Sequence, residues 1–485
     1  MAAAERLYRA AWETDPQGGE AQHLLGLLAH GRGDSGGAAV LIGGAIAVHG
    51  DRPTYHFNLG IVLAALGDAA GAIAAYRRAA ELRPADAKVW NNLGVALGRE
   101  GALDEACAAL RRAVACAPRS VEALVNLCAA LARLGQPGEA DEAIGAGRSA
   151  VGLAPDFAPA HGALASALAA GGRLGAAVEA AERAAALAPL DGRSALTLAR
   201  LLFRARRWAE AAEAAERAVR LGAEDGDGLL GAATLRQGDA LASLAFLDRA
   251  LDGGWGEDSA LAAASRGLAL LALGRRDEAA AWLGLEGLLG ERMLAPEGWS
   301  GPSAFNSALE AEVLAHPTLR REPQGYVSRG GWLTGNLLLA PTPLLRTLEM
   351  ALRRAIDAWT SELSPASHPF VRSRPSRYRL VAWASILEAG ASLASHIHEG
   401  AWASGAYYAR APRFDPARNA GDEKAGWIEF GLRPDGSRFA FEPLTASRRP
   451  REGLLLLFPA HLHHRTLEFG DPGKRITISF NCYAI

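Results

Sequence analysis

Residues 90–118 read WNNLGVALGREGALDEACAALRRAVACAP, and this stretch carries the period that decides the N-terminal fold. Gly94 follows Gly60, and Gly60 follows Gly26, at intervals of 34 residues. We expect this small residue to lie where one helix approaches the next, and Gly101, seven residues later, to end the first helix of the pair. The period therefore predicts two helices per unit, neither of which buries its apolar face alone.

The same spacing continues along the first 290 residues. Eight small residues mark it, with a three-residue insertion after the fourth: Gly26, Gly60, Gly94, Cys128, Ala165, Ala199, Ala233 and Gly267. This pattern resembles the tetratricopeptide repeat. The resemblance implies about eight repeats in residues 1–290, stacked into an all-α superhelix whose concave groove binds a protein or a peptide. A pure scaffold is equally compatible with it.

The overall composition excludes several classes of partner. The chain has 51 Lys and Arg against 53 Asp and Glu, so no strong net field attracts nucleic acid or an anionic membrane. No apolar run approaches the roughly 18 residues that a transmembrane helix needs. The four cysteines form no CxxC pair and indicate neither a disulfide framework nor a zinc site, so a reducing, cytoplasmic setting is expected.

The pattern changes at residues 293–301, where the helical period breaks. We expect a linker with a helical preface at residues 291–324 and a further domain at residues 325–485. A helix is predicted at 344–362. Six strands separated by turn residues are predicted after it, at 378–387, 393–398, 405–410, 427–431, 454–459 and 475–483. This order predicts an all-β barrel or sandwich.

Two groups of histidines lie in this β-rich part. His396 and His398 are two residues apart, a spacing that projects both imidazoles to one face of a strand. His461, His463 and His464 follow an apolar strand. Three ligands from two strands suit a mid-row divalent metal with open coordination positions better than a closed structural zinc site, although zinc remains possible.

An arginine opens the last predicted strand. Arg475 begins the sequence RITISFN, eleven residues after His464. A guanidinium on a strand near a metal is a suitable bidentate partner for a carboxylate, whereas an ordinary surface arginine is the alternative reading of this residue.

These motifs together resemble the 2-oxoglutarate-Fe(II) oxygenases related to prolyl hydroxylases, over roughly residues 325–485. The resemblance rests on His396-Ile-His398, Ser404 to Tyr408, Gly426 to Phe430, Phe458 to His464 and Arg475 to Asn481. It implies a double-stranded β-helix, or jelly roll, that binds Fe(II) and 2-oxoglutarate. It also implies that His396, His464 and His398 act as catalytic metal ligands, and that Arg475, Thr477 and Tyr408 bind the cosubstrate.

The sequence departs from the wider superfamily at one ligand, because His-x-Asp or His-x-Glu is replaced by His-x-His. The third ligand is then His398, Glu399 or neither. The resemblance favours a dioxygenase that uses dioxygen and 2-oxoglutarate to hydroxylate a protein or peptide side chain delivered by the repeat groove. Two alternatives stay open: a three-histidine dioxygenase of the cupin type without 2-oxoglutarate, and a non-catalytic repeat scaffold with a metal-binding barrel.

Overall fold

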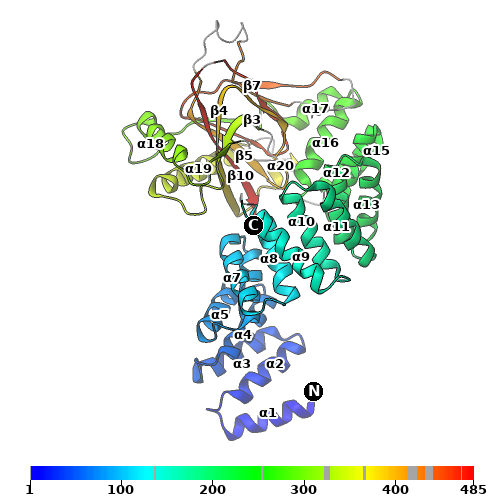
Figure 1. Ribbon diagram of the computed structural model, residues 1–485, viewed down its shortest axis with the longest axis vertical. Coiled ribbons are helices and arrows are strands. Elements are labelled where there is room, and N and C mark those ends of the chain that lie inside the picture. Colours follow the sequence, from blue (N-terminus) through cyan, green and yellow to red (C-terminus); the bar gives the residue numbers. More distant parts are fainter. Residues whose placement is uncertain are drawn as a thin grey trace. The chain divides into compact units, whose positions relative to one another are not determined.

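A computed structural model describes residues 2–135, 138–252, 255–321, 328–363, 368–412, 423–431, 441–470 and 472–485. The chain forms two compact units, which divide between Gly171 and Gly172. The first unit consists of helices, and the second contains further helices and the strands (Figure 1). In the described part of the chain, no helix is long and apolar enough to cross a membrane.

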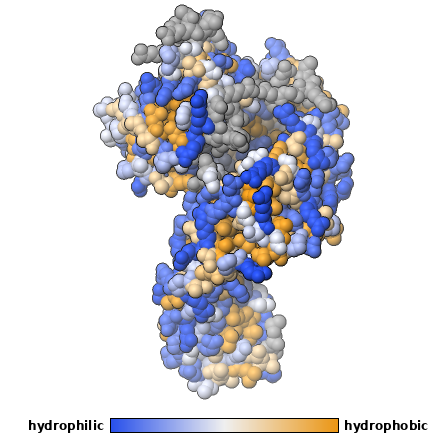
Figure 2. Space-filling model, viewed as in Figure 1, coloured by the Kyte–Doolittle hydropathy of each residue, from blue (hydrophilic) through white to orange (hydrophobic). Residues whose placement is uncertain are grey.

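The first unit is built from antiparallel helices connected by short turns. Their bounds are α1 Ala2–Thr14, α2 Glu20–Gly31, α3 Ser35–Val48, α4 Pro53–Ala65, α5 Ala69–Leu82, α6 Ala87–Arg99, α7 Leu103–Cys116, α8 Val121–Leu134, α9 Ala140–Leu153 and α10 Ala158–Ala170. Hydrophilic and hydrophobic residues are interspersed on the visible face of this unit (Figure 2).

The recurring small residue has the role that its spacing predicts. A Cβ atom on Gly60 would meet the Tyr76 ring at 2.5 Å, and one on Gly94 would meet Leu110 Cγ at 2.5 Å. Each glycine therefore allows the first helix of a repeat to approach the second. The next glycine, Gly101, has a φ of 79°, a conformation that ends α6 and that other residues rarely adopt.

Repeat helices continue in the second unit up to Leu283. Their bounds are α11 Leu174–Leu187, α12 Gly192–Arg204, α13 Trp208–Arg220, α14 Gly226–Gln237, α15 Ala240–Asp252, α16 Ser259–Ala272 and α17 Arg276–Leu283. Among the described residues, α2–α9 of the first unit form four consecutive packed pairs, and α12–α17 of the second unit form three more.

An antiparallel, strand-rich sheet follows the helices, and the fold-class prediction is confirmed. The strands are β1 Gly290–Met293, β2 Arg320–Arg321, β3 Ser328–Leu333, β4 Tyr378–His396, β5 Ala403–Arg410, β6 Ile428–Phe430, β7 Ala446–Arg448, β8 Leu454–Pro459, β9 His464–Thr466 and β10 Arg475–Ala484. The helices of this part are α18 Pro302–Leu314, α19 Pro343–Glu362 and α20 Pro369–Arg372. The main path of the curled sheet is β1-β8-β5-β10-β4-β9-β6-β7, with β3 on β4 and β2 on β3.

Strand β4 differs from its prediction, because the strands expected at 378–387 and 393–398 form one strand that ends at His396. Its first half pairs with β10, and its end pairs with β9 through a register shift between Leu393 and His396. Gly390 takes a positive φ of 80° between the two halves without ending the strand. The strand thereby links β10, which begins with Arg475, to the histidine-bearing strand β9.

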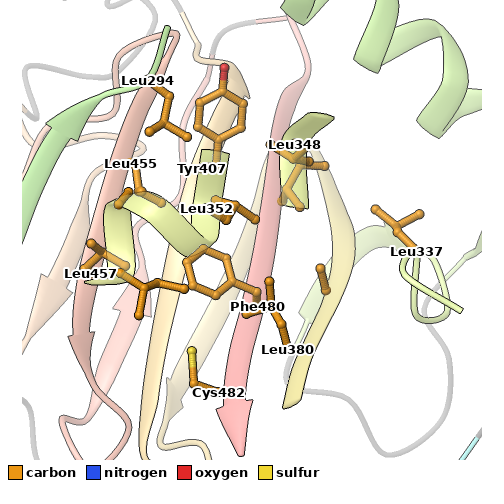
Figure 3. Packing of buried hydrophobic residues seen from close by; sticks show 14 of the residues in the cluster. Leu294, Leu337, Leu348, Leu352, Leu380, Tyr407, Leu455, Leu457, Phe480 and Cys482 are labelled. Atoms are coloured by element: carbon orange, nitrogen blue, oxygen red, sulfur yellow. The ribbon is translucent and has the colours of Figure 1, made fainter. Parts of the chain in front are cut away.

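Helix α19 packs on the sheet and covers one apolar core. Leu348 and Leu352 of α19 belong to the same buried cluster as Leu380, Leu457 and Phe480 of the strands (Figure 3). Strand β1 extends the sheet by pairing with β8. The segment expected to be a linker therefore contributes two strands to the sheet, because β2 also lies in it and pairs with β3.

A second core joins the last repeats to the sheet. Leu247 of α15 and Trp282 of α17 lie in one buried cluster with Phe430, Leu456 and Phe458 of the strands. These repeat helices therefore bury part of their apolar surface against the β-rich part rather than against another repeat.

Candidate metal centre

Three of the predicted site residues meet at the junction of β4 and β9. One donor nitrogen from each of His396, His398 and His464 lies within 4.8 Å of the others. The ring centroids of His396 and His464 are 4.3 Å apart, because the two residues face each other across the β4–β9 ladder. His398 follows the end of β4, and its amide donates to the Ala460 carbonyl at 3.0 Å.

Backbone contacts orient two of these rings. The Nδ1 atom of His396 lies 2.8 Å from the Ala394 carbonyl, and that of His464 lies 2.9 Å from the Leu462 carbonyl. Because a carbonyl only accepts hydrogen bonds, both Nδ1 atoms carry the proton. The Nε2 atom of each ring is thus left with a free lone pair, which is the arrangement that a histidine ligand requires.

Burial keeps all three rings neutral. It lowers the pKa of His396, and it holds the pKa values of His398 and His464 well below the ordinary range, with further lowering from the neighbouring imidazoles. Only a neutral imidazole binds a metal, so this environment favours the ligand form.

The alternatives that the sequence left open occupy other positions. Glu399 is exposed and does not belong to the three-residue donor group. His461 is fully buried among aromatic rings, 6.0 Å from the Trp255 centroid and 6.4 Å from the Trp282 centroid. His463 is also outside the donor group, although its ring lies near His396.

Aromatic residues that the sequence reasoning did not assign to the site surround the three histidines. The Phe458 and Phe430 rings lie 4.8 Å and 5.9 Å from the His464 ring. Trp383 lies 5.8 Å from the His398 ring. Both phenylalanines occur in the quoted motifs, but nothing in the sequence distinguishes a residue that contacts a ligand from any other buried strand residue.

Arg475 is a buried cation with neutral partners. It is 2% exposed, and it donates to the Tyr408 hydroxyl at 3.1 Å, the Gly426 carbonyl at 3.3 Å and the Thr477 hydroxyl at 3.3 Å. Its pKa is lowered by burial. The described residues provide no carboxylate for an ion pair with Arg475, so this guanidinium offers its charge to an anionic group.

Strand pairing connects the segment that carries Arg475 to the strand that carries His396. Thr477 pairs with Tyr408 across β10 and β5, and Arg475 pairs with Leu387 of β4, the strand that ends at His396. Tyr408, Phe430 and Phe458 share one apolar cluster. Five of the six predicted site residues therefore lie on neighbouring strands, and His398 directly follows the end of β4.

The donor set fits a divalent metal with open coordination positions. Metal–imidazole bonds are about 2.0–2.1 Å long, so two nitrogens on one ion lie up to about 4 Å apart. A small rotation of the rings would bring donors spread over 4.8 Å to that spacing. Three neutral imidazoles suit iron, zinc and copper alike, and the set contains no carboxylate.

Two family models match the chain. Residues 381–481 match the family described as Putative 2OG-Fe(II) oxygenase. The Tetratricopeptide repeat family matches residues 32–87, 57–121, 163–228 and 196–258. A comparison with curated proteins gave no significant match.

Similar solved structures include two tetratricopeptide repeat proteins and MamA. A tetratricopeptide repeat protein from Parabacteroides merdae is 16% identical, with a TM-score of 0.44, and the match covers 50% of this chain and 97% of that one. YrrB, described as having an unusual peptide-binding site, is 19% identical with a TM-score of 0.34, covering 38% and 92%. MamA is 22% identical with a TM-score of 0.32, covering 34% and 95%.

Proposed function

Because the chain joins a tetratricopeptide repeat region to a domain that matches the 2OG-Fe(II) oxygenases, we propose that it is an Fe(II)- and 2-oxoglutarate-dependent dioxygenase. The proposed reaction hydroxylates a side chain of a protein or peptide. The observation that carries the proposal is that one domain contains both a three-histidine cluster and a buried arginine. This arginine has no acidic partner among the described residues.

In this proposal His396, His398 and His464 hold the iron. Bound Fe(II), with 2-oxoglutarate and dioxygen, supplies the oxidising chemistry, in which one oxygen atom enters a C–H bond and the other enters succinate as carbon dioxide leaves. The protonated Nδ1 atoms of His396 and His464 fix the rings through backbone carbonyls. The rings of Phe430 and Phe458 keep water away from this side of the centre.

Arg475 binds the far carboxylate of 2-oxoglutarate in this proposal. Its planar donor fork matches a carboxylate, and burial strengthens each charge-assisted hydrogen bond. The hydroxyls of Tyr408 and Thr477 hold the guanidinium in place and can turn toward the same carboxylate.

The repeats are proposed to present the substrate. Tetratricopeptide repeats support interaction with another protein, since stacked helix pairs form an extended concave surface. The shared core between α15, α17 and the strands supports this role, because it joins the last repeats to the domain that carries the histidines.

One observation favours a second candidate. The metal-binding group contains three histidines and no carboxylate, a ligand set that also fits a dioxygenase of the cupin type without 2-oxoglutarate. Arg475 separates the two candidates, because only the reaction with 2-oxoglutarate needs a buried cation to bind a second carboxylate.

The test is 2-oxoglutarate turnover by the full chain. The purified protein is reconstituted with Fe(II) without oxygen, exposed to oxygen, and assayed for succinate. We expect succinate to form slowly without a peptide and to require both the iron and Arg475. Oxygen consumption without any succinate would favour the cupin-type reaction. If the protein neither consumes oxygen nor forms succinate, the scaffold is favoured.

A further inference from the structure

Helices of the last repeats border the metal centre. Leu235 of α14 belongs to the same buried cluster as Leu462. Arg236 follows Leu235 in the chain, and His463 follows Leu462. The two side chains lie close enough for the guanidinium charge to act on the imidazole. Helix α14 therefore packs against the segment that carries His463 and His464.

The turn after His398 also contacts the repeats. Ala401 packs with Ala260 of α16 in one buried cluster, and a Cβ atom on Gly400 would lie 4.0 Å from the Glu257 carbonyl. The charges of Arg204 and Arg200 at the end of α12 reach Glu399 in this turn. Two further helices, α12 and α16, therefore border the same side of the site.

The arginines on this side divide into two kinds. Arg200 is neutralised by ion pairs of 2.9–3.3 Å with Asp225, Glu257 and Asp258. Arg206 and Arg236, by contrast, have no carboxylate within 4 Å in the part of the chain that the structure describes. Burial, followed by repulsion from Arg206, lowers the pKa of Arg236.

The surroundings of these two arginines indicate a binding role. The Arg236 guanidinium lies 5.9 Å from the centroid of the Trp208 ring, which in turn packs edge-on against Phe203 at 4.9 Å. Arg206 has a φ of 60°, an uncommon conformation for a residue other than glycine. The two guanidiniums carry like charges that repel each other, and one of them is half-buried against an aromatic ring. An anion bound to both would offset this repulsion.

We propose that Arg206 and Arg236 form an anion-binding surface that recognises an acidic side chain of the polypeptide substrate, close to the residue that is modified. This inference rests on the proposed function, and it adds a substrate class to it. An acidic polypeptide is favoured because two guanidinium forks on neighbouring repeats, without a carboxylate partner among the described residues, suit carboxylates carried on an extended chain. Substrate selection is then shared between the repeats and the metal-binding domain.

The test measures binding separately from turnover. The full chain, loaded with Mn(II) in place of iron, is titrated into a fluorescein-labelled Glu–Ala repeat peptide and into its Lys–Ala counterpart, and anisotropy is recorded at low and at physiological salt. We expect tighter binding of the Glu–Ala peptide, and a loss of about 10-fold or more in the Arg206→Glu/Arg236→Glu variant, because like charges repel. Raising the salt should reduce the preference.

Arg193→Glu is the matched control, because Arg193 is an exposed arginine at the other end of α12, about 16 Å along the helix from Arg204. It should bind the Glu–Ala peptide within about 2-fold of the wild type, since screening weakens charges beyond about 10 Å. A neutral variant, Arg206→Gln/Arg236→Gln, keeps the test valid if charge reversal disturbs folding, which circular dichroism would detect.

Equal affinity of the wild type for the two peptides would overturn the proposal, as would an equal loss in the Arg193→Glu control. Succinate formation without peptide is measured in parallel. A wild type that prefers the acidic peptide but forms no succinate would contradict the proposed function and leave this surface supported.

Discussion

His464 faces His396 across the β4–β9 ladder, with the two ring centroids 4.3 Å apart. Because backbone carbonyls hold both rings through Nδ1, their relative orientation is fixed by the sheet and does not depend on a bound ion. The centre is therefore preorganised by strand pairing.

Metal binding should depend on this pair. His396→Ala and His464→Ala should each abolish stoichiometric Fe(II) binding, which we expect at about one ion per chain, because two remaining imidazoles chelate weakly. His463→Ala is the matched control, since His463 lies beside His464 but outside the donor group. Metal content after anaerobic reconstitution measures the effect. Unchanged iron content in folded His396→Ala would remove the centre from the proposal.

Cosubstrate binding should depend on Arg475 separately from the metal. Arg475→Ala should weaken 2-oxoglutarate binding by about 2 to 5 kcal/mol, or roughly 30-fold to several thousand-fold, because a buried bidentate charge contact is lost. Iron affinity should stay nearly unchanged. Calorimetric titration of the metal-loaded protein measures both.

Arg465→Ala is the control for this variant. Arg465 pairs with Glu429 at 2.7 Å on the neighbouring strands, is partly exposed, and has no contact with Tyr408 or Thr477. Equal 2-oxoglutarate affinities of Arg475→Ala and the wild type would leave the cosubstrate site without support.

The sequence predicted the repeat register because close helix packing needs a small residue, and Gly60 and Gly94 indeed have no room for a side chain. It also predicted which histidines meet, because His396 and His398 are adjacent on one segment. The spacing alone did not choose among His461, His463 and His464; the family resemblance implied His464, which is the one that lies in the donor group.

The sequence did not predict the core that the last repeats share with the strands. The period reports packing within and between repeats, but an apolar helix face has the same composition whether a further repeat or a sheet covers it. Leu247 and Trp282 read as ordinary repeat residues, although they lie in one cluster with Phe430 and Phe458. The domain boundaries expected at 290 and 325 remain predictions.

Acid should destabilise the second unit partly through His461. This ring is fully buried, both of its nitrogens lack a hydrogen-bond partner among the described residues, and burial, with smaller effects of His368 and His463, lowers its pKa to about 3. The unfolded chain therefore binds more protons than the folded one between about pH 6.5 and 3. Stability is present above this window and is lost as the pH falls, by up to about 1.4 kcal/mol per pH unit.

His461→Phe should remove this contribution, because phenylalanine fits the aromatic surroundings and has no nitrogen to protonate. Urea unfolding of the metal-free protein at pH 7 and pH 5 measures the free energy of unfolding. The wild type should lose about 2 kcal/mol more than the variant over this range. Identical pH dependence of the two proteins would show that His461 does not titrate as its burial predicts.

Trp282 should stabilise the junction between the last repeats and the sheet. Its indole nitrogen donates to the Ala263 carbonyl at 2.9 Å, the Arg266 guanidinium lies 4.2 Å from its ring centroid, and the His368 ring lies 5.0 Å away. Trp282→Ala should cost about 3–5 kcal/mol, since it opens a cavity in a core that repeats and strands share. Trp299→Ala, at a position 37% exposed, is the control and should cost less than about 1 kcal/mol of unfolding free energy.

The informative measurement is iron affinity at a temperature where both variants remain folded. If the shared core holds the metal-binding strands in place, Trp282→Ala should weaken iron binding although no ligand has changed. Destabilisation with undiminished iron affinity would mean that strand pairing alone positions the histidines.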